Sequence, residues 1–458
     1  MTSQKATYRK QQLKYVSVDL LSAECVWLLF LFFRWLVYEG RIFGVNTVLI
    51  PAFNFYQPLL LYPLGSVIVY YLAGFYLRPQ PQHKRIPQVL GSTFVCAFII
   101  SIVAFFCVII NDEITSYTYY YVSLLVLFSI QFLVSFLFRL CVKLNDYISW
   151  RKGLVQTRTL IIGDGKLSRQ VAQDLHDDEY IVFLALSELD RLSDKILSEK
   201  IQRVIIAVEG DVSKEFLYQI INKIYPLQVE ISFTPSVYDM LIGAARINDL
   251  AGTPLVTITD PSMSDWQICV KRATDITVSF LCLVVFSPLY LVLAALVKFT
   301  SAGPVIYKQE RIGLYGRPFM IWKFRTMKNN AEMQLPQLTS PDDDRVTPIG
   351  HWLRKYRLDE LPQFWNILRG DMSIVGPRPE RAYYIRQIMQ RAPYYCLLYK
   401  IRPGLTSWGP IRVGYTDTIE KMIDRLNFDM VYMENMSLLL DLKILFYTIR
   451  VIVDGEGQ

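Results

Sequence analysis

The sequence predicts a multidomain membrane protein: an N-terminal four-helix transmembrane bundle, a Rossmann-like α/β module, and a C-terminal, mainly α-helical domain with a re-entrant membrane helix. Hydrophobic residues make up 52% of the 458 positions, which is high for a soluble chain, and they gather in long runs. Apolar strands alternate with helical segments in the middle of the chain, and a proline interrupts the apolar run that opens the C-terminal part. We therefore expect three domains, at residues 1–150, 154–260 and 268–458.

The bundle is predicted from four apolar stretches, at roughly residues 15–38, 55–77, 89–110 and 118–142. Each is close to the ~20 residues that a helix needs to span a bilayer. The N-terminal arm, the second link and the exit from the fourth stretch are basic, whereas the first link is neutral overall and the third is acidic. Because basic flanks stay in the cytoplasm, both ends of the bundle should face the cytoplasm.

Charged residues interrupt the first apolar stretch, at Asp19, Glu24 and Arg34. A charge near the middle of the bilayer costs roughly 2.5–3.5 kcal/mol on the insertion scale. We therefore expect Glu24 to face the interior of the bundle and to have a partner there. A functional role for this acid is the alternative, because acids inside membranes often mark functional sites.

The middle module begins with an apolar strand at residues 159–162, followed by Gly163-Asp164-Gly165 and an amphipathic helix that runs through Leu175. Two further buried strands are expected at residues 203–208 and 229–233, and this alternation indicates a parallel α/β layer. Ser168 stands where the third glycine of a dinucleotide fingerprint belongs, and no ribose-binding acid follows at the usual spacing. We expect a structural module without NAD.

The apolar stretch Thr274–Phe299 contains Ser287-Pro288 at its centre. Proline removes a backbone donor and bends a helix, and Ser287 can supply a replacement donor. Basic residues flank the stretch on both sides, so both of its ends should stay in the cytoplasm. A helix that enters the membrane, breaks at Ser287 and Pro288 and returns satisfies both conditions. A kinked spanning helix is the alternative.

Asp359 and Glu360 form an adjacent acid pair that Leu361-Pro362 closes. Two neighbouring carboxylates repel each other, and a cationic surround or a metal ion holds both ionised. An acid pair alone is more often an ordinary solvated helix turn. Here basic residues surround it, which suits a phosphate substrate. These residues are Arg354, Lys355, Arg357, Arg369 and Arg378.

Five motifs occur around this pair in a fixed order. They are KFRTM (Lys323–Met327), DDRVTPIG (Asp343–Gly350), LDELPQFWN (Leu358–Asn366), GDMSIVGPRP (Gly370–Pro379) and RPGLT (Arg402–Thr406). Together they resemble the bacterial sugar transferase family, the monotopic phosphoglycosyl transferases that start polysaccharide assembly. The resemblance is specific over Lys271–Gln458 and weaker over the rest. Larger members carry a similar module between a membrane bundle and the catalytic part, and a re-entrant helix with a Ser-Pro break.

The resemblance implies transfer of a hexose-1-phosphate from a UDP-sugar to undecaprenyl phosphate, with release of UMP, at the bacterial inner membrane. By the match to the LDELP motif, Asp359 would be the nucleophile and would carry the phosphosugar, and Glu360 would hold Mg²⁺. The substrate-binding candidates are Lys323, Arg325, Arg354 and Arg378. Arg325 is a weaker candidate, as are Arg357 and Arg402, because a structural ion pair is more common than substrate contact for such residues.

The sugar is not identified by the sequence. Family members often read PGITGLAQV where this chain reads PGLTSWGP at Pro403–Pro410, and this stretch is a candidate for sugar selection. A membrane scaffold that binds the sugar nucleotide without turnover is a second hypothesis. A nucleotide-sugar dehydratase is a third, but the module lacks the fingerprint and the YxxxK pair that it needs.

The net charge and the cysteine and histidine content limit the binding partners and metal sites that we expect. The net charge of +7 suits anionic lipid, so we expect the bilayer and no nucleic acid as a partner. The seven cysteines form no CxxC and the three histidines do not cluster, which argues against a zinc site or a disulfide framework. The size of the bundle is compatible with a homodimer.

Three aromatic residues, Trp352, Phe364 and Trp365, are candidates for the lipid interface or for core packing. The polar loop Asn329–Asp344 suits a mobile cover over a site. The last apolar run, Met433–Val453, carries charges and is expected to pack on the domain or to lie at the membrane surface.

Overall fold

The computed structural model describes residues 2–36, 56–73, 75–76, 86–107, 117–151, 158–175, 180–208, 214–227, 229–234, 256–257, 263–328, 343–413 and 418–453. They form two compact units, one of residues 1–156 with 264–273 and one of residues 157–263 with 274–458. The links between the predicted membrane helices, and most of the loop Asn329–Asp344, lie outside the described residues.

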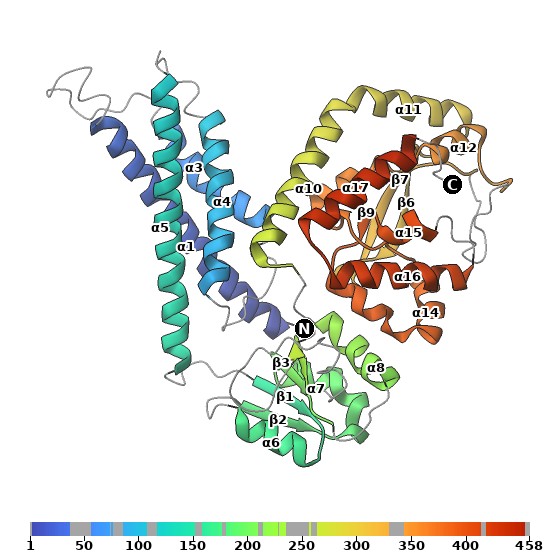
Figure 1. Ribbon diagram of the computed structural model, residues 1–458, viewed down its shortest axis with the longest axis horizontal. Coiled ribbons are helices and arrows are strands. Elements are labelled where there is room, and N and C mark those ends of the chain that lie inside the picture. Colours follow the sequence, from blue (N-terminus) through green and yellow to red (C-terminus); the bar gives the residue numbers. More distant parts are fainter. Residues whose placement is uncertain are drawn as a thin grey trace. The chain divides into compact units, whose positions relative to one another are not determined.

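The first unit is a bundle of apolar helices (Figure 1). Its helices are α1 (Thr2–Arg34), α3 (Tyr56–Leu72), α4 (Ile86–Cys107) and α5 (Tyr117–Arg151). Helix α1 packs against α3 and α5, and α4 packs against α5. By length and composition, three segments of the described chain can each cross a membrane: Gln12–Arg34, Leu90–Cys107 and Tyr120–Asp146. The apolar part of α3, Leu59–Leu72, is shorter.

A buried ion pair joins the first and last helices of the bundle. Asp19 on α1 is 0% exposed and Arg139 on α5 is 1% exposed. The guanidinium donates from Nε to Asp19 Oδ1 and from a terminal nitrogen to Oδ2, both at 2.9 Å. Tyr76 donates its hydroxyl proton to Asp19 Oδ2 at 2.6 Å. A bidentate pair with further hydrogen bonds is the geometry in which two charges can be kept out of water.

The prediction for Glu24 is wrong, because its side chain is exposed on the outside of the bundle, whereas that of Asp19 faces the interior. Five residues turn an α-helix through about 140° beyond a full turn, so these two acids cannot share one face. The sequence showed that an acid lay within the span, but it did not show which acid faced inward.

Replacing Asp19 with alanine should therefore destabilise the bundle strongly. Arg139 would stay buried without its anion, and breaking a buried pair in this way costs about 3–5 kcal/mol. Glu24→Ala, on the exposed face of the same helix, is the matched control and should unfold near the wild-type temperature. Thermal unfolding in detergent micelles measures both variants. Equal losses in the two would contradict the assigned role of Asp19.

The second unit begins with a five-stranded sheet in the order β2-β1-β3-β4-β5. The strands are β1 (Arg158–Ile162), β2 (Tyr180–Leu184), β3 (Arg203–Ile206), β4 (Glu230–Phe233) and β5 (Val256–Thr257). The first four run parallel and β5 is antiparallel to β4. Helices α6 (Lys166–Asp174), α7 (Leu192–Ser198) and α8 (Lys214–Ile224) accompany them.

The three strands that the sequence predicted in this region are present, and β2 and the two-residue β5 were missed. Strand β2 lies at the edge of the sheet and buries only Leu184 completely, so it lacks the continuous apolar signal of β1 and β3. The turn after β1 needs glycine at Gly163, where φ is +137° and a Cβ would lie 2.1 Å from the Ala207 carbonyl oxygen.

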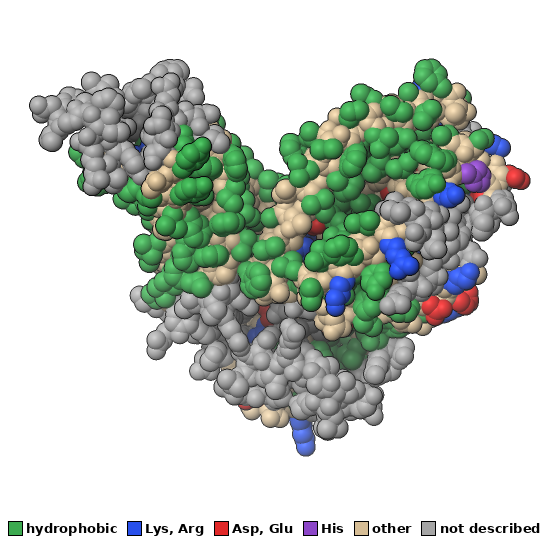
Figure 2. Space-filling view, turned by 45° about the horizontal axis from the view of Figure 1, so that its top comes forward, with side chains coloured by type: hydrophobic (Ala, Val, Ile, Leu, Met, Phe, Trp, Pro, Cys, Tyr) green, Lys and Arg blue, Asp and Glu red, His purple; other side chains and the backbone are tan. Residues whose placement is uncertain are grey.

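The apolar run that opens the C-terminal part is broken where the sequence predicted. Helices α10 (Asp265–Val285) and α11 (Ser287–Thr300) meet at 64°. Pro288 has no N–H to donate to the Val284 carbonyl one turn earlier, and the Ser287 hydroxyl donates to that oxygen instead, at 2.8 Å. Large apolar side chains of these helices are exposed, among them Val285, Leu291 and Phe299. Figure 2 shows extended hydrophobic surface on this side of the molecule.

The remainder of the second unit is mainly helical, with two small sheets. Strands β6 (Ile306–Ile312) and β7 (Pro318–Phe324) form an antiparallel hairpin, and β8 (Ser373–Val375) pairs in parallel with β9 (Gly404–Thr406). The helices are α12 (Pro348–Lys355), α13 (Gln363–Arg369), α14 (Ala382–Arg391), α15 (Trp408–Val413), α16 (Ile419–Glu434) and α17 (Leu438–Val453), with short 3-10 turns η7 (Leu358–Glu360) and η8 (Pro393–Lys400).

The sequence predicted a single helix over the final apolar run, Met433–Val453, and these bounds are wrong. Met433 still belongs to α16, and α17 begins at Leu438. Asp441 of α17 is buried and accepts a hydrogen bond from the Tyr432 hydroxyl at 2.7 Å, which fixes α17 to α16. The opposite face of α17 exposes Leu442 and Phe446. This agrees with the expectation that the segment packs on the domain.

Candidate active site

The acid pair lies on η7, in the turn between α12 and α13. Asp359 is 7% exposed and Glu360 is 8% exposed. Arg357, just before them, has φ 53° and ψ 24°, a left-handed conformation that costs an L-residue about 1–2 kcal/mol. The chain can thereby reverse its direction sharply, so that Asp359, Glu360 and Arg357 lie close together.

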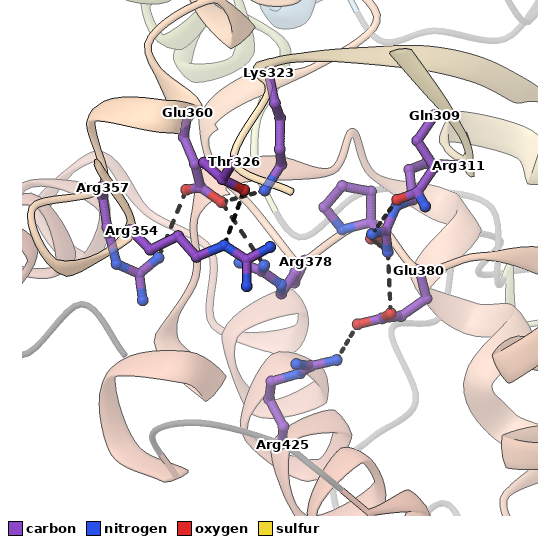
Figure 3. Close-up of polar contacts among 11 residues, drawn as sticks. Gln309, Arg311, Lys323, Thr326, Arg354, Arg357, Glu360, Arg378, Glu380 and Arg425 are labelled. Atoms are coloured by element: carbon purple, nitrogen blue, oxygen red, sulfur yellow. Dashed lines mark hydrogen bonds and ion pairs between the residues drawn. The ribbon is translucent and has the colours of Figure 1, made fainter. Parts of the chain in front are cut away.

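Two contacts of Asn366, on the helix that follows the pair, fix the strand that carries Lys323. The Asn366 amide donates to the Met320 carbonyl oxygen at 2.7 Å and accepts from the Trp322 N–H at 3.0 Å. Helix α13 and strand β7 are therefore held in register. Lys323 extends from this strand towards Glu360, and its ammonium lies 2.7 Å from Glu360 Oε1 (Figure 3).

Glu360 is the anion at the centre of three cations (Figure 3). Besides Lys323, an Arg357 nitrogen lies 3.6 Å from Oε2 and an Arg378 nitrogen lies 3.7 Å from Oε1. Burial alone would raise the pKa of Glu360, but the charges of Lys323, Arg378 and Arg357 outweigh it and hold the pKa below its usual range. Glu360 is therefore ionised at neutral pH.

The environment of Asp359 acts in the opposite direction. Burial raises the pKa of its carboxyl group above the usual range, only partly offset by Lys323, and the charge of Glu360 raises it further. In the described part of the chain, no group forms a hydrogen bond or ion pair with this carboxyl. Two neighbouring acids whose pKa values are pushed apart have distinct chemical roles. Glu360 is therefore the ionised member of the pair, and the Asp359 carboxyl group is the one whose pKa is raised.

Arg354 lies in the same cluster. Its Nε donates to the Thr326 hydroxyl at 3.0 Å, and its positive charge helps to lower the pKa of Asp359 (Figure 3). The start of α12 is bound to the end of β7, since the Thr347 N–H donates to the Thr326 carbonyl oxygen at 2.9 Å. The motifs KFRTM and DDRVTPIG thus meet in space and place Arg354 beside the acid pair.

The structure brings four predicted residues together with Asp359, namely Glu360, Lys323, Arg354 and Arg378, but not Arg325. The Arg325 guanidinium donates to the Ser301 carbonyl oxygen at 2.6 Å and binds the end of α11. Strand β7 ends at Phe324, so Arg325 does not continue the alternation that would place it beside Lys323. Arg402 also has a structural contact, from Nε to the Gly370 carbonyl oxygen at 3.0 Å.

The three aromatic candidates separate into two groups. Trp352 and Trp365 are 45% and 44% exposed, as an interfacial role requires. Phe364 packs against the core of the C-terminal part. The sequence left these alternatives open, and burial distinguishes them.

A second charged group, which sequence reasoning missed, holds the loop that carries Arg378. Glu380 pairs with Arg311 at 3.4 Å and with Arg425 of α16 (Figure 3). Asp429, one helical turn after Arg425, accepts hydrogen bonds from the Ser407 hydroxyl and from the Gly409 N–H, the latter at 3.2 Å. The only signal in the sequence is the spacing of four between Arg425 and Asp429, and it is weak because α16 carries four other charged residues.

Burial raises the pKa of Asp429 to about 6, although the hydrogen bond from Ser407 and the charge of Arg425 act to lower it. A raised pKa means that the contribution of this group to stability is present below its unfolded value of 3.8 and is lost as the pH rises through about 6. Asp429→Asn should therefore gain stability relative to wild type between pH 4 and pH 8, by up to about 3 kcal/mol. Paired thermal unfolding curves at several pH values measure this. A difference that is independent of pH would contradict the buried charge.

The donor atoms at the acid pair fit Mg²⁺ only in part. The described residues contain no group of three or more His, Cys, Asp or Glu side chains that could hold a metal ion. Mg²⁺ in phosphate-binding sites, however, commonly takes one or two carboxylates, and substrate phosphates and water complete its coordination. Asp359 and Glu360 can supply these carboxylates, although Glu360 already contacts cations.

Comparison with known proteins places these residues in a family context. The model of the family described as "Bacterial sugar transferase" matches residues 266–455. The chain is 37% identical over 266 residues to a UDP-glucose:undecaprenyl-phosphate glucose-1-phosphate transferase of Escherichia coli (strain K12), covering 57% of this chain and 56% of that protein. It is 42% identical over 221 residues to a UDP-N-acetylgalactosamine-undecaprenyl-phosphate N-acetylgalactosaminephosphotransferase of Aeromonas hydrophila, covering 48% and 52%.

A third relative is matched over more of its length. It is a UDP-glucose:undecaprenyl-phosphate glucose-1-phosphate transferase of Caulobacter vibrioides, 41% identical over 181 residues, which are 39% of this chain and 68% of that protein. The chain spans only a little more than half the length of the other two relatives. All of the residues that surround the acid pair lie inside the segment that the family model matches.

Proposed function

Because this chain belongs to the bacterial sugar transferase family, we propose that it transfers a hexose-1-phosphate from a UDP-sugar to undecaprenyl phosphate and releases UMP. The product, undecaprenyl-diphosphate-sugar, would start the assembly of a polysaccharide. The activities for which these relatives are named support the substrate classes. They include both a glucose and an N-acetylgalactosamine transferase, so the hexose itself stays open.

The observation that carries the proposal is the contrast within the acid pair. Asp359 has a carboxyl group that no hydrogen bond or ion pair from the described residues engages, and cations stand beside it. A carboxylate of this kind can attack phosphorus, while the cations bind the oxygens of the diphosphate. Lys323, Arg354 and Arg378 are placed for this second task.

The reaction would take two steps. An Asp359 oxygen forms a bond to the sugar-bearing phosphorus, and the bond from that phosphorus to the bridging oxygen breaks, which releases UMP. An oxygen of undecaprenyl phosphate then attacks the same phosphorus, and the bond to Asp359 breaks. The carboxylate is regenerated, and each acceptor enters the site separately.

Mg²⁺ belongs to this proposal, with Glu360 as its protein ligand. When bound with the diphosphate, the ion would neutralise charge on the phosphate oxygens. The chain itself would bind the remaining oxygens with Lys323 and the arginines, and would hold Glu360 ionised.

Contacts of α11 support a site at the membrane surface. Leu293 and Val297 of this apolar helix pack in one cluster with Leu358 and Leu361, which flank the acid pair. The Tyr290 hydroxyl donates to the Leu361 carbonyl oxygen at 2.8 Å. If α10 and α11 enter and leave the inner membrane from the cytoplasmic side, the acid pair lies at the height where a lipid-borne phosphate is found. The 64° break and the apolar surface around it are compatible with this re-entrant arrangement.

The proposal includes two finer features of the fold. Helix α3 would be the fourth transmembrane helix of the bundle, although its apolar part is short. The five-stranded sheet would be a Rossmann-like module, and the parallel order β2-β1-β3-β4 supports this assignment.

The test is release of UMP by the purified protein from a panel of UDP-sugars, with and without undecaprenyl phosphate and Mg²⁺. We expect continuous release from one or a few sugars, and only when the lipid acceptor and Mg²⁺ are present. A scaffold would bind a UDP-sugar without releasing UMP. Absence of release across the whole panel, from a protein that folds and binds a UDP-sugar, would contradict the proposed reaction.

A further inference from the structure

The loop that carries Arg378 is held from one side by two residues of α16. Arg425 pairs with the side chain of Glu380 (Figure 3), and Asp429 accepts a hydrogen bond from the backbone N–H of Arg378. Residues four apart lie on one face of a helix, so Arg425 and Asp429 bind two points of the same short loop. The guanidinium of Arg378, in this loop between β8 and α14, lies 3.7 Å from Glu360.

Asp429 also binds a second segment of the chain. The Ser407 hydroxyl and the Gly409 N–H both donate to Oδ1 of its carboxylate. A Cβ at Gly409 would lie 2.2 Å from the side chain of Arg425, so this turn lies directly against α16. The turn belongs to the stretch in which the sequence departs from the common family pattern.

The same two segments are joined by their backbones. The Gly376 N–H donates to the Thr406 carbonyl oxygen at 3.0 Å, and the Gly404 N–H donates to the Pro377 carbonyl oxygen at 2.9 Å. Gly404 and Gly376 are so close that a Cβ on Gly404 would lie 2.1 Å from the Gly376 nitrogen. A shift of the turn that Asp429 binds is therefore transmitted to the loop of Arg378.

We propose that Asp429 is a positioning residue for the transfer reaction: its carboxylate binds both the Ser407–Gly409 turn and the Arg378 backbone, and so holds the Arg378 guanidinium beside the acid pair. This inference rests on the proposed function, because it assigns to Arg378 a role in binding the diphosphate. Asp429 itself does not touch the substrate.

The chemistry of the carboxylate is suited to this role. It has two acceptor oxygens and no donor, and it is surrounded by three donors: a hydroxyl and two backbone N–H groups. An asparagine has one acceptor oxygen and would turn its amide nitrogen towards one of these donors. A neutral, equally large side chain therefore fills the space but cannot hold both segments.

The test is a double-mutant cycle with Asp429→Asn and Arg378→Ala, read as kcat/KM for UMP release by the full chain. Asp429→Asn alone should lower kcat/KM on the order of 10- to 100-fold, the effect of losing a buried hydrogen bond to a charged group. In the Arg378→Ala protein the same substitution should have no further effect, because no guanidinium remains to be misplaced.

Controls separate positioning from folding. Asn427→Ala changes an exposed residue of α16 that contacts Tyr394, and it should leave kcat/KM within about twofold. The cycle is run in parallel with Ser407→Ala, which removes one donor but keeps the charge, so that the result does not depend on one variant. Thermal unfolding at pH 8 should show that Asp429→Asn does not lose enough stability to account for its lower kcat/KM.

If the effects of Asp429→Asn and Arg378→Ala multiply in the double variant, Asp429 does not act through Arg378 and the inference is wrong. This outcome is distinct from failure of the proposed function. In that case the wild-type protein would release no UMP, whatever the variants show.

Discussion

Replacing Asp359 with asparagine is expected to lower UMP release at least about 10³-fold, because an amide oxygen cannot form and then leave a bond to phosphorus as a carboxylate does. The substitution preserves the size of the side chain. It should also preserve the fold, since burial raises the pKa of Asp359 and thus favours a neutral group at this position. Activity should therefore be lost without loss of stability.

The measurement is UMP release by the wild type and the variant at equal protein concentration, with unfolding temperatures beside it. Asp344→Asn is a suitable control, because Asp344 is an exposed acid in the neighbouring motif. It should retain wild-type activity. Substantial UMP release by the Asp359→Asn protein would show that Asp359 is not the nucleophile.

Glu360→Gln should have the second largest effect on UMP release, and unlike Asp359→Asn it should also lower the stability of the protein. Three cations share the Glu360 carboxylate, and a neutral amide would leave them close together without an anion. Removing one partner of a buried pair destabilises by about 3–5 kcal/mol. We expect activity to fall on the order of 100-fold or more, together with a lower unfolding temperature and a weaker response to Mg²⁺.

The pH dependence of stability distinguishes the two acids. The lowered pKa of Glu360 means that its contribution to stability is present above its unfolded pKa and is lost as the pH falls. The loss of stability in Glu360→Gln should therefore be largest at neutral pH and should shrink in acid. A Glu360→Gln protein as stable as wild type at pH 7 would contradict the cation cluster.

The site could be predicted from sequence where the motifs are short and local. The sequence placed Asp359, Glu360 and Lys323 in one candidate cluster and added Arg378 from the Pro-Arg-Pro turn, and the structure brings these residues together. In the sequence, Arg325 and Arg357 had equally weak support, but Arg357 contacts Glu360 and Arg325 does not. Their positions depend on where β7 ends and on a left-handed residue after α12. Neither the end of a strand nor one positive φ is visible in residue spacing.

Contacts between distant segments could not be predicted. Asp19 and Arg139 are 120 positions apart, so nothing in the first apolar stretch indicates which acid has a partner. Asp429 binds Ser407 from 22 positions away, and its helix contains several other charged residues, so nothing in the sequence singles it out. The break between α16 and α17 was missed because no proline or glycine marks it, whereas Ser287-Pro288 marks the break between α10 and α11 directly.

The central claim is that Asp359 becomes bonded to the sugar phosphate, and mass spectrometry of the protein tests it most directly. The protein is mixed with its preferred UDP-sugar and Mg²⁺ in the absence of undecaprenyl phosphate, stopped with acid and digested. We expect a mass increase of one hexose phosphate on the peptide that contains Asp359, together with about one UMP per protein chain. A protein that needs the lipid before it releases any UMP, or that carries the sugar phosphate on another residue, would contradict this claim.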